Sequence, residues 1–102
     1  MFKAIKSLFA GGPSADFKAL AAQGATIVDV RSKGEYASGH IKGSINIPLD
    51  TLQSNLKKIS KAKPVITCCA SGMRSASAKG ILQNNGYEVY NGGGWSSLKS
   101  KL

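Results

Sequence analysis

The stretch at residues 65–74 reads VITCCASGMR and contains both cysteines of the chain. Its first four residues, Val65 to Cys68, are apolar or β-branched, which is typical of a strand buried on both faces of a parallel sheet. Cys69 then opens a tight segment that contains a glycine, and an alanine-rich helix is expected from Arg74 to Asn84. The stretch therefore predicts a strand, a loop and a helix, with Cys69 at the carboxyl end of the strand, where ligands of such folds sit.

Outward from this stretch, predicted strands alternate with predicted helices. The other strands are expected at 26–30, 44–47 and 87–90. The other helices are expected from a cap at Ser14 to Gly24, from a Ser32–Glu35 capping box to Gly39, and over 48–60, where Leu49, Leu52, Leu56 and Ile59 form an amphipathic pattern. A single helical turn is expected after Trp95. This alternation predicts an α/β fold with helices on both faces of a central parallel sheet.

Length and composition exclude several classes of protein. The chain has 102 residues, enough for one domain, and 14 Lys and Arg against 5 Asp and Glu give a net charge of +9. No apolar run approaches the ~20 residues that span a bilayer. Cys68 and Cys69 are adjacent, so neither a disulfide scaffold nor a structural zinc site is expected. A reduced, cytoplasmic protein without cofactor or metal is the expectation.

The first residues form a separate segment. Phe2, Ile5, Leu8 and Phe9 follow helical spacing, with Lys3 and Lys6 on another face. We therefore expect an amphipathic helical extension over residues 1–12 and a single domain over 13–102. Ten residues make a weak membrane anchor, so packing on the domain's own core is favoured over a surface anchor.

The chemistry is expected in the loop that Cys69 opens. A thiol before a glycine-bearing turn and a helix start faces backbone N–H groups and the positive end of the helix dipole. Such surroundings stabilise a thiolate, a persulfide or a bound oxyanion. Cys69 is thus the candidate nucleophile. The candidate substrate-binding residues are Ala70, Ser71, Gly72, Met73, Arg74 and Ser75.

Three motifs carry a resemblance to a known family. They are DVR at 29–31 with Glu35-Tyr36 and GHIKGSINIP at 39–48, the six-residue loop CASGMR at 69–74, and NGGGW at 91–95, whose spacing to the tryptophan is compressed. The sequence resembles the rhodanese family from about Ser14 to Leu98. The resemblance implies a three-layer α/β/α fold with a central parallel sheet of four to five strands.

The resemblance also implies an activity. Cys69 would take sulfane sulfur from thiosulfate, polysulfide or glutathione persulfide, hold it as a persulfide, and pass it to a thiol, cyanide or a protein acceptor. Ala70 stands where many members of the family carry a basic residue, so weak recognition of the thiosulfate dianion is expected. A short or missing edge strand is also expected at the N-terminus, where residues 11–14 replace a β-rich opening.

The remaining polar residues are assigned mainly structural roles. Cys68 should point away from Cys69 because side chains alternate along a strand. Arg74 is expected to close the anion loop rather than only to pair with a carboxylate. Asp29, Arg31 and Glu35 are predicted to form hydrogen bonds that fix loops. His40 is expected to be structural rather than a catalytic base, as the resemblance implies. Trp95 is expected to cover the core near the site.

Three alternatives stay open at this stage. A phosphatase or arsenate reductase would use a loop one residue longer, counted from Cys68, but the strand length favours Cys69. A sulfur carrier or regulatory binding module would keep the same loop without rapid turnover. A basic surface for nucleic acid or anionic lipid is a minor possibility, because the lysines are scattered and few aromatic residues accompany them.

Overall fold

The computed structural model describes residues 15–102, and the expected extension over residues 1–12 lies outside this range. Its elements in chain order are α2 (Phe17–Ala22), β1 (Thr26–Asp29), α3 (Lys33–Ser38), β2 (Ile45–Asn46), the 3-10 helix η1 (Leu49–Lys58), β3 (Val65–Cys69), α4 (Met73–Asn84), β4 (Val89–Gly94) and α5 (Trp95–Lys99). Four strands form one sheet in the order β2-β1-β3-β4, and all pairs are parallel. The predicted α/β class is confirmed, with four strands in the described part of the chain.

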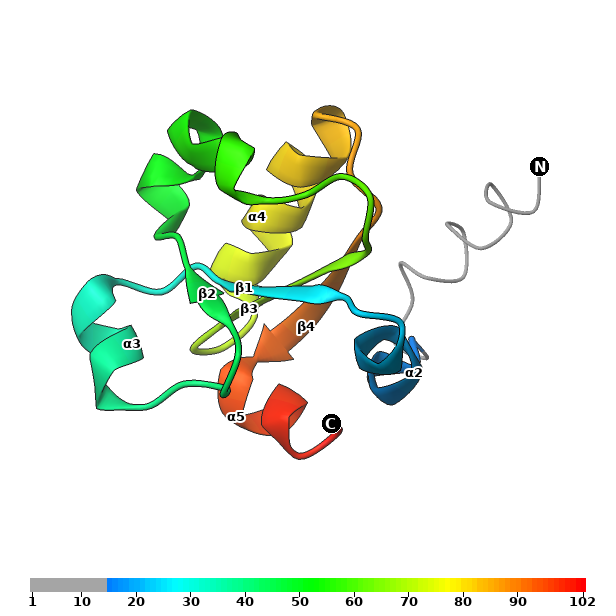
Figure 1. Ribbon diagram of the computed structural model, residues 1–102. Helices are drawn as coiled ribbons and strands as arrows, with labels where there is room; N and C mark the ends of the chain where they lie inside the picture. Colours follow the sequence, from blue (N-terminus) through cyan, green and yellow to red (C-terminus); the bar gives the residue numbers. More distant parts are fainter. Residues whose placement is uncertain (1–14) are drawn as a thin grey trace.

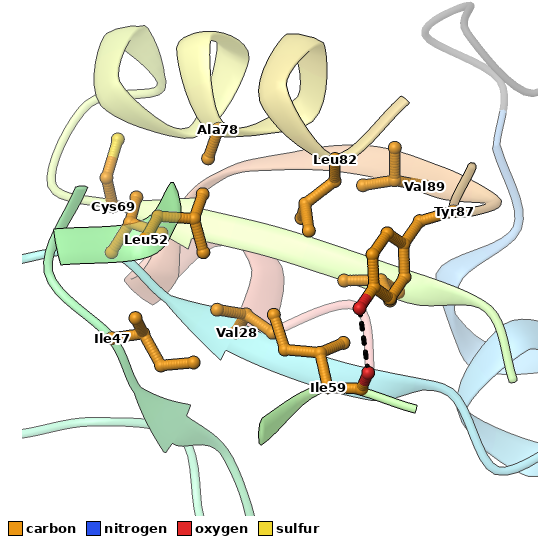
Figure 2. Close-up of a cluster of buried hydrophobic side chains, with 11 residues drawn as sticks. Val28, Ile47, Leu52, Ile59, Cys69, Ala78, Leu82, Tyr87 and Val89 are labelled. Atoms are coloured by element: carbon orange, nitrogen blue, oxygen red, sulfur yellow. Dashed lines mark hydrogen bonds between the residues drawn. The ribbon is translucent and has the colours of Figure 1, made fainter. Parts of the chain in front are cut away.

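The sheet is covered on both faces (Figure 1). One apolar cluster joins η1 and α4 to the sheet and includes Leu52, Leu82 and Cys69. The other joins α2 and α5 to the opposite face and includes Phe17, Leu98 and Cys68. Successive side chains of a strand point to opposite faces, so the two adjacent cysteines lie in different clusters. The predicted orientation of Cys68 away from Cys69 is confirmed, and Figure 2 shows Cys69 in the first cluster.

The predicted N-cap is confirmed for α3 but not for α2. The capping box of α3 is present: Glu35 N–H donates to Ser32 Oγ, and Ser32 N–H donates to the Glu35 carboxylate. The predicted cap of α2 at Ser14 is wrong. Asp16 caps this helix, because its carboxylate accepts a hydrogen bond of 3.0 Å from Ala19 N–H, three residues on. A carboxylate at this position also suits the helix dipole.

The amphipathic segment over 48–60 is helical but is not the expected α-helix. It forms a 3-10 helix with a non-helical residue, Asn55, inside it. Leu49 and Leu52 are three residues apart, as are Leu56 and Ile59, and a 3-10 helix places residues with this spacing on one face. The extra residue between the two pairs falls at the kink, where Asn55 Nδ2 donates to the Thr51 carbonyl. The apolar face predicted from the sequence is therefore kept by a tighter helix.

The last strand starts and ends later than predicted. Tyr87 does not join the sheet, and its N–H donates to the Leu82 carbonyl. Its hydroxyl lies 2.9 Å from the carbonyl oxygens of both Leu56 and Ile59, and Figure 2 shows the contact with Ile59. β4 continues through the glycines to Gly94. Thr67 pairs with Asn91 and Cys69 with Gly94, so β4 has one extra residue between these pairs. This is a β-bulge, a feature that re-aims side chains next to functional sites.

Candidate functional site

The site is built at the carboxyl end of β3, where Cys69 is the last residue of the strand. Cys69 Sγ accepts hydrogen bonds from Gly72 N–H at 2.9 Å and from Ser75 N–H at 3.3 Å. Gly72 has a φ of +108°, which glycine adopts without strain, and it directly precedes the 12-residue helix α4. The sulfur therefore faces backbone N–H groups at the positive end of a helix, as the sequence predicted.

The surroundings of the two thiols differ in their effect on acidity. Burial raises the pKa of Cys69, but hydrogen bonds from the Ser75 side chain and from the backbone of Ser75, Gly72 and Ser71 outweigh it, and the pKa is lowered. Burial raises the pKa of Cys68 to about 12, helped by the charge of Asp29. Cys69 is thus the thiol that forms a thiolate more readily.

The side chains of the loop present little charge to a ligand. Ala70 and Ser71 are exposed, and Met73 is 79% exposed. Arg74 forms a bidentate ion pair with Glu35 at 2.7 and 2.9 Å, with both side chains 38% exposed. This pair raises the pKa of Arg74 and is the main reason that the pKa of Glu35 falls to about 2. The alternative of pairing with a carboxylate is thus realised, while a role of Arg74 toward a bound anion stays a prediction.

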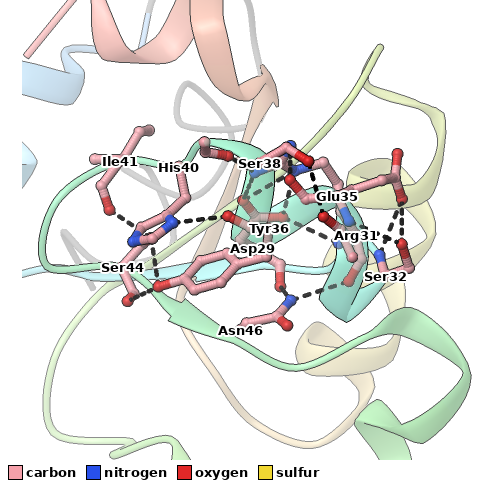
Figure 3. Close-up of polar contacts among 12 residues, drawn as sticks. Asp29, Arg31, Ser32, Glu35, Tyr36, Ser38, His40, Ile41, Ser44 and Asn46 are labelled. Carbon is pink, nitrogen blue, oxygen red and sulfur yellow. Dashed lines mark hydrogen bonds and ion pairs between the residues drawn. The ribbon is translucent and has the colours of Figure 1, made fainter.

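A buried polar cluster anchors α3 beside the site (Figure 3). The Arg31 guanidinium donates to both carboxylate oxygens of Asp29 and to the carbonyls of Glu35 and Gly39. It also lies 4.7 Å from the ring centre of Trp95. Glu35 reaches from α3 to Arg74, so this cluster connects the sheet, α3 and the start of α4. The predicted hydrogen-bonding roles of Asp29, Arg31 and Glu35 are confirmed.

In the described residues, neither His40 nor Trp95 forms a hydrogen bond with the sulfur of Cys69. The ring of His40 stacks on Tyr36 at 3.8 Å, and its Nδ1 lies 2.8 Å from the Tyr36 carbonyl. Trp95 packs against the cluster that contains Cys68, and a Cβ atom at Gly39 would lie 3.1 Å from its ring. Both therefore support the fold around the site, as the sequence predicted.

A pocket of about 330 Å³ opens beside Arg74. Its lining residues are Val30, Ser32, Pro48, Leu49, Asp50 and Arg74. Val30 belongs to the same buried cluster as Cys69, and Arg74 ends the loop that Cys69 opens. The pocket is large enough for a low-molecular-weight thiol.

Asn91 is the residue whose position the sequence did not reveal. It belongs to the NGGGW motif, but no partner could be assigned to it. In the structure its Oδ1 accepts hydrogen bonds from Ser75 Oγ at 2.6 Å and from Gly93 N–H at 2.9 Å. Ser75 is 16 residues away, and the contact joins β4 to the start of α4, two segments whose proximity no local sequence pattern predicts.

The glycines of β4 allow close contact with the loop. A Cβ atom at Gly94 would lie 2.8 Å from the Ala70 carbonyl oxygen, closer than real Cβ contacts come. The backbone of the loop therefore rests directly on β4.

Gly94→Ala is expected to push the loop away and to destabilise the fold by about 1–3 kcal/mol, as overpacking does. Its expected signature is slower alkylation of Cys69 at a given pH, because the N–H groups around the sulfur are displaced. Urea unfolding and iodoacetamide kinetics measure the two effects. Gly80→Ala is the control, since a Cβ there meets nothing within 4 Å. Equal behaviour of the two variants would contradict the steric argument.

In the described residues 15–102, no cluster of His, Cys, Asp and Glu could hold a metal ion, and no helix is long and apolar enough to cross a membrane.

The fold and the site define a class of protein: an α/β protein with a thiol held by backbone N–H groups between a strand and a helix. The family model described as rhodanese-like domain matches residues 14–101. The chain belongs to the rhodanese-like domain family.

Relatives and solved structures agree with this assignment. The chain is 39% identical over 80 residues to the uncharacterized protein YqhL of Bacillus subtilis, covering 76% of this chain and 64% of that protein. It is 34% identical over 79 residues to the thiosulfate sulfurtransferase GlpE of Pseudomonas fluorescens, covering 76% and 72%. The human single-domain sulfurtransferase TSTD1 superposes with a TM-score of 0.71 at 29% identity, covering 90% and 99%. The chain thus spans less than two thirds of the length of YqhL.

Proposed function

We propose that the protein is a sulfurtransferase that carries sulfane sulfur on Cys69. The observation that carries this proposal is the position of Cys69 Sγ, which accepts hydrogen bonds from Gly72 N–H and Ser75 N–H at the start of α4. These donors stabilise a sulfur anion without a separate base or metal. The names of the relatives, thiosulfate sulfurtransferases among them, support the same activity.

The reaction would proceed in two displacements. The Cys69 thiolate attacks the outer sulfur of thiosulfate, the S–S bond of the donor breaks, and sulfite leaves with the electron pair. A persulfide anion then remains on Cys69. In the second step a thiolate or cyanide attacks the outer sulfur, the persulfide bond breaks, and the Cys69 thiolate is restored. Polysulfide or glutathione persulfide would serve as donor by the same displacement, with a shorter polysulfide or a thiolate leaving.

The backbone N–H groups around Sγ stabilise the thiolate that starts and ends this cycle. A thiolate at Sγ uses the N–H groups of Gly72 and Ser75 directly. Fixed dipoles of this kind do not have to reorganise during the reaction, which is why they lower its barrier. The pocket beside Arg74 is the proposed place for a small thiol acceptor, because Arg74 of the loop lines it and its lining is largely apolar.

The phosphatase alternative requires Cys68 to be the nucleophile. Cys68 lies on the opposite face of the sheet, fully buried with Phe17 and Leu98. Its pKa of about 12 disfavours the thiolate. Both observations favour Cys69 and its six-residue loop.

The test is sulfur loading followed by mass spectrometry. The reduced protein, incubated with thiosulfate or with polysulfide, is expected to gain the mass of one sulfur atom on the peptide that contains Cys69, and cyanide is expected to remove it. Failure of both donors to add sulfur would overturn the proposal. Loading with slow release to small thiols but fast release to one protein would instead favour the carrier alternative.

The neutral loop predicts a weak response to thiosulfate. Ala70 is exposed, and the guanidinium of Arg74 is engaged by Glu35. Ala70→Lys is therefore expected to raise kcat/KM for thiosulfate about two- to fivefold at low salt, the effect of one exposed charge interaction. The gain should shrink with added salt, since exposed charges are screened.

The matched control for this variant is Gln83→Lys, at an exposed position near the far end of α4. It adds the same charge at a distance from the loop. An equal gain in both variants would show that net charge, rather than the residue at position 70, governs the use of thiosulfate.

A further inference from the structure

The hydroxyl of Ser75 lies close to the Cys69 thiol, which donates to it, and to two carbonyl oxygens that can accept from it. Its Oγ is 3.4 Å from Cys69 Sγ, 3.0 Å from the Gly72 carbonyl and 2.6 Å from Asn91 Oδ1. A serine hydroxyl has one proton to donate, and the shortest of these contacts is the one to Asn91. The Ser75 O–H group donates one hydrogen bond, and it can donate it either to Asn91 Oδ1 or to a Cys69 thiolate.

Asn91 is held so that its carbonyl oxygen is the group that faces Ser75. The same Oδ1 accepts a hydrogen bond from Gly93 N–H at 2.9 Å. The amide NH₂ of Asn91 can only donate, so it could not take the place of Oδ1 as the acceptor for Gly93 N–H. Ser75 is held as well: it is fully buried, and Thr67 Oγ1 donates to its carbonyl at 2.9 Å. With both residues fixed, the choice left to the Ser75 hydroxyl is the direction of its O–H bond.

The protonation of Cys69 decides which direction is favoured. A neutral thiol can donate its own proton to Ser75 Oγ, and Ser75 then donates to Asn91 Oδ1. A thiolate has no proton and needs donors, so Ser75 is drawn toward the sulfur and away from Asn91. Each state of the sulfur thus has its own arrangement of one hydroxyl.

We propose that Asn91 is a positioning residue that competes with the Cys69 sulfur for the hydroxyl proton of Ser75. This competition makes the free thiolate less favourable than the N–H groups of the loop alone would make it. The proton stays on Ser75 Oγ throughout, and only the acceptor of its hydrogen bond changes.

The competition has a consequence for sulfur transfer, and this part rests on the proposed function. In a persulfide the negative charge lies mainly on the outer sulfur, and Sγ is bonded to carbon and sulfur. Sγ is then a weak acceptor, so the Ser75 hydroxyl returns to Asn91. Asn91 therefore favours the persulfide relative to the free thiolate, and so promotes loading over release.

The first test is the acidity of Cys69 in the Cys68→Ser background, which leaves a single thiol. Asn91→Ala is expected to increase the ratio of thiolate to thiol at a fixed pH about three- to tenfold, the net effect of one neutral hydrogen bond. Ultraviolet thiolate absorbance and the pH dependence of iodoacetamide alkylation measure it. The charged groups around the site, the Arg74–Glu35 pair and the buried Asp29–Arg31 pair, are the same in all variants.

A double-mutant cycle distinguishes positioning through Ser75 from a general structural effect. In the Ser75→Ala background, Asn91→Ala is expected to leave the acidity of Cys69 unchanged, because no hydroxyl remains for which to compete. If Asn91→Ala fails to fold, Asn91→Leu removes the same acceptor while filling the space. An unchanged or less acidic Cys69 in the Asn91 variant, or the same shift with and without the Ser75 hydroxyl, would overturn the proposal.

The second test is the loading equilibrium. At a fixed ratio of thiosulfate to sulfite, and at a pH where free Cys69 is mainly thiolate, Asn91→Ala is expected to lower the ratio of persulfide to thiolate by the same factor by which it raises the ratio of thiolate to thiol. An equilibrium unchanged by the substitution would reject the link to sulfur transfer. Absence of loading in every variant would instead count against the proposed function, while the acidity cycle would still report on Asn91 and Ser75.

Discussion

Cys69→Ser is expected to abolish sulfur loading, whereas Cys68→Ser is expected to leave it intact. The sulfur of Cys69 is the one that receives the N–H groups of Gly72 and Ser75. A serine hydroxyl at this position is a far weaker nucleophile than a thiolate, and the site offers no adjacent base to activate it. Cys68 is packed on the other face of the sheet, where a serine costs some stability but does not touch the loop.

Mass spectrometry after incubation with polysulfide measures this difference directly. The wild type and Cys68→Ser should each gain one sulfur that cyanide removes, and Cys69→Ser should gain none. The loading rate should also depend on pH. Since the pKa of Cys69 is lowered, the thiolate forms below the ordinary pKa of a cysteine, and the rate should reach its plateau at a correspondingly lower pH. Loading that persists in Cys69→Ser and disappears in Cys68→Ser would reverse the assignment.

The sequence was sufficient for the parts of the fold that depend on local patterns. The buried run from Val65 to Cys68, the capping box of Ser32 and Glu35, and the glycine at position 72 each act over a few residues. Side-chain alternation along β3 likewise predicted the opposite orientations of Cys68 and Cys69. These patterns predicted that Cys69 lies between the end of a strand and the start of a helix.

Contacts between distant segments could not be predicted in this way. Arg74 meets Glu35 across 39 residues, and Ser75 meets Asn91 across 16. Both contacts depend on the strand order of the sheet, which local patterns do not specify. The sequence predicted a helix at η1 but not its 3-10 type. Apolar residues three or four positions apart suit an α-helix and a 3-10 helix alike over so short a stretch.

The buried pair of Asp29 and Arg31 carries the largest expected effect on stability. Asp29 is fully buried, and Arg31 donates to both of its carboxylate oxygens while also binding the carbonyl of Gly39. The hydrogen bonds to Asp29 are the main reason that the pKa of Arg31 is raised. Asp29→Ala is expected to lower the free energy of unfolding by about 3–5 kcal/mol, because it leaves a buried guanidinium without its counter-charge. Urea unfolding measures this loss.

Two comparisons separate the buried charge from other causes of the loss. The double variant Asp29→Ala/Arg31→Met removes the unpaired charge, so it should be more stable than Asp29→Ala alone, although the bonds to Gly39 and Glu35 are lost. Glu35→Gln breaks the half-exposed pair with Arg74 and should cost much less, since exposed ion pairs contribute little. If Asp29→Ala were no more harmful than Glu35→Gln, the buried pair would not be what holds α3 against the sheet. The orientation of Glu35 toward Arg74 would then have to be maintained by the Ser32 capping box alone.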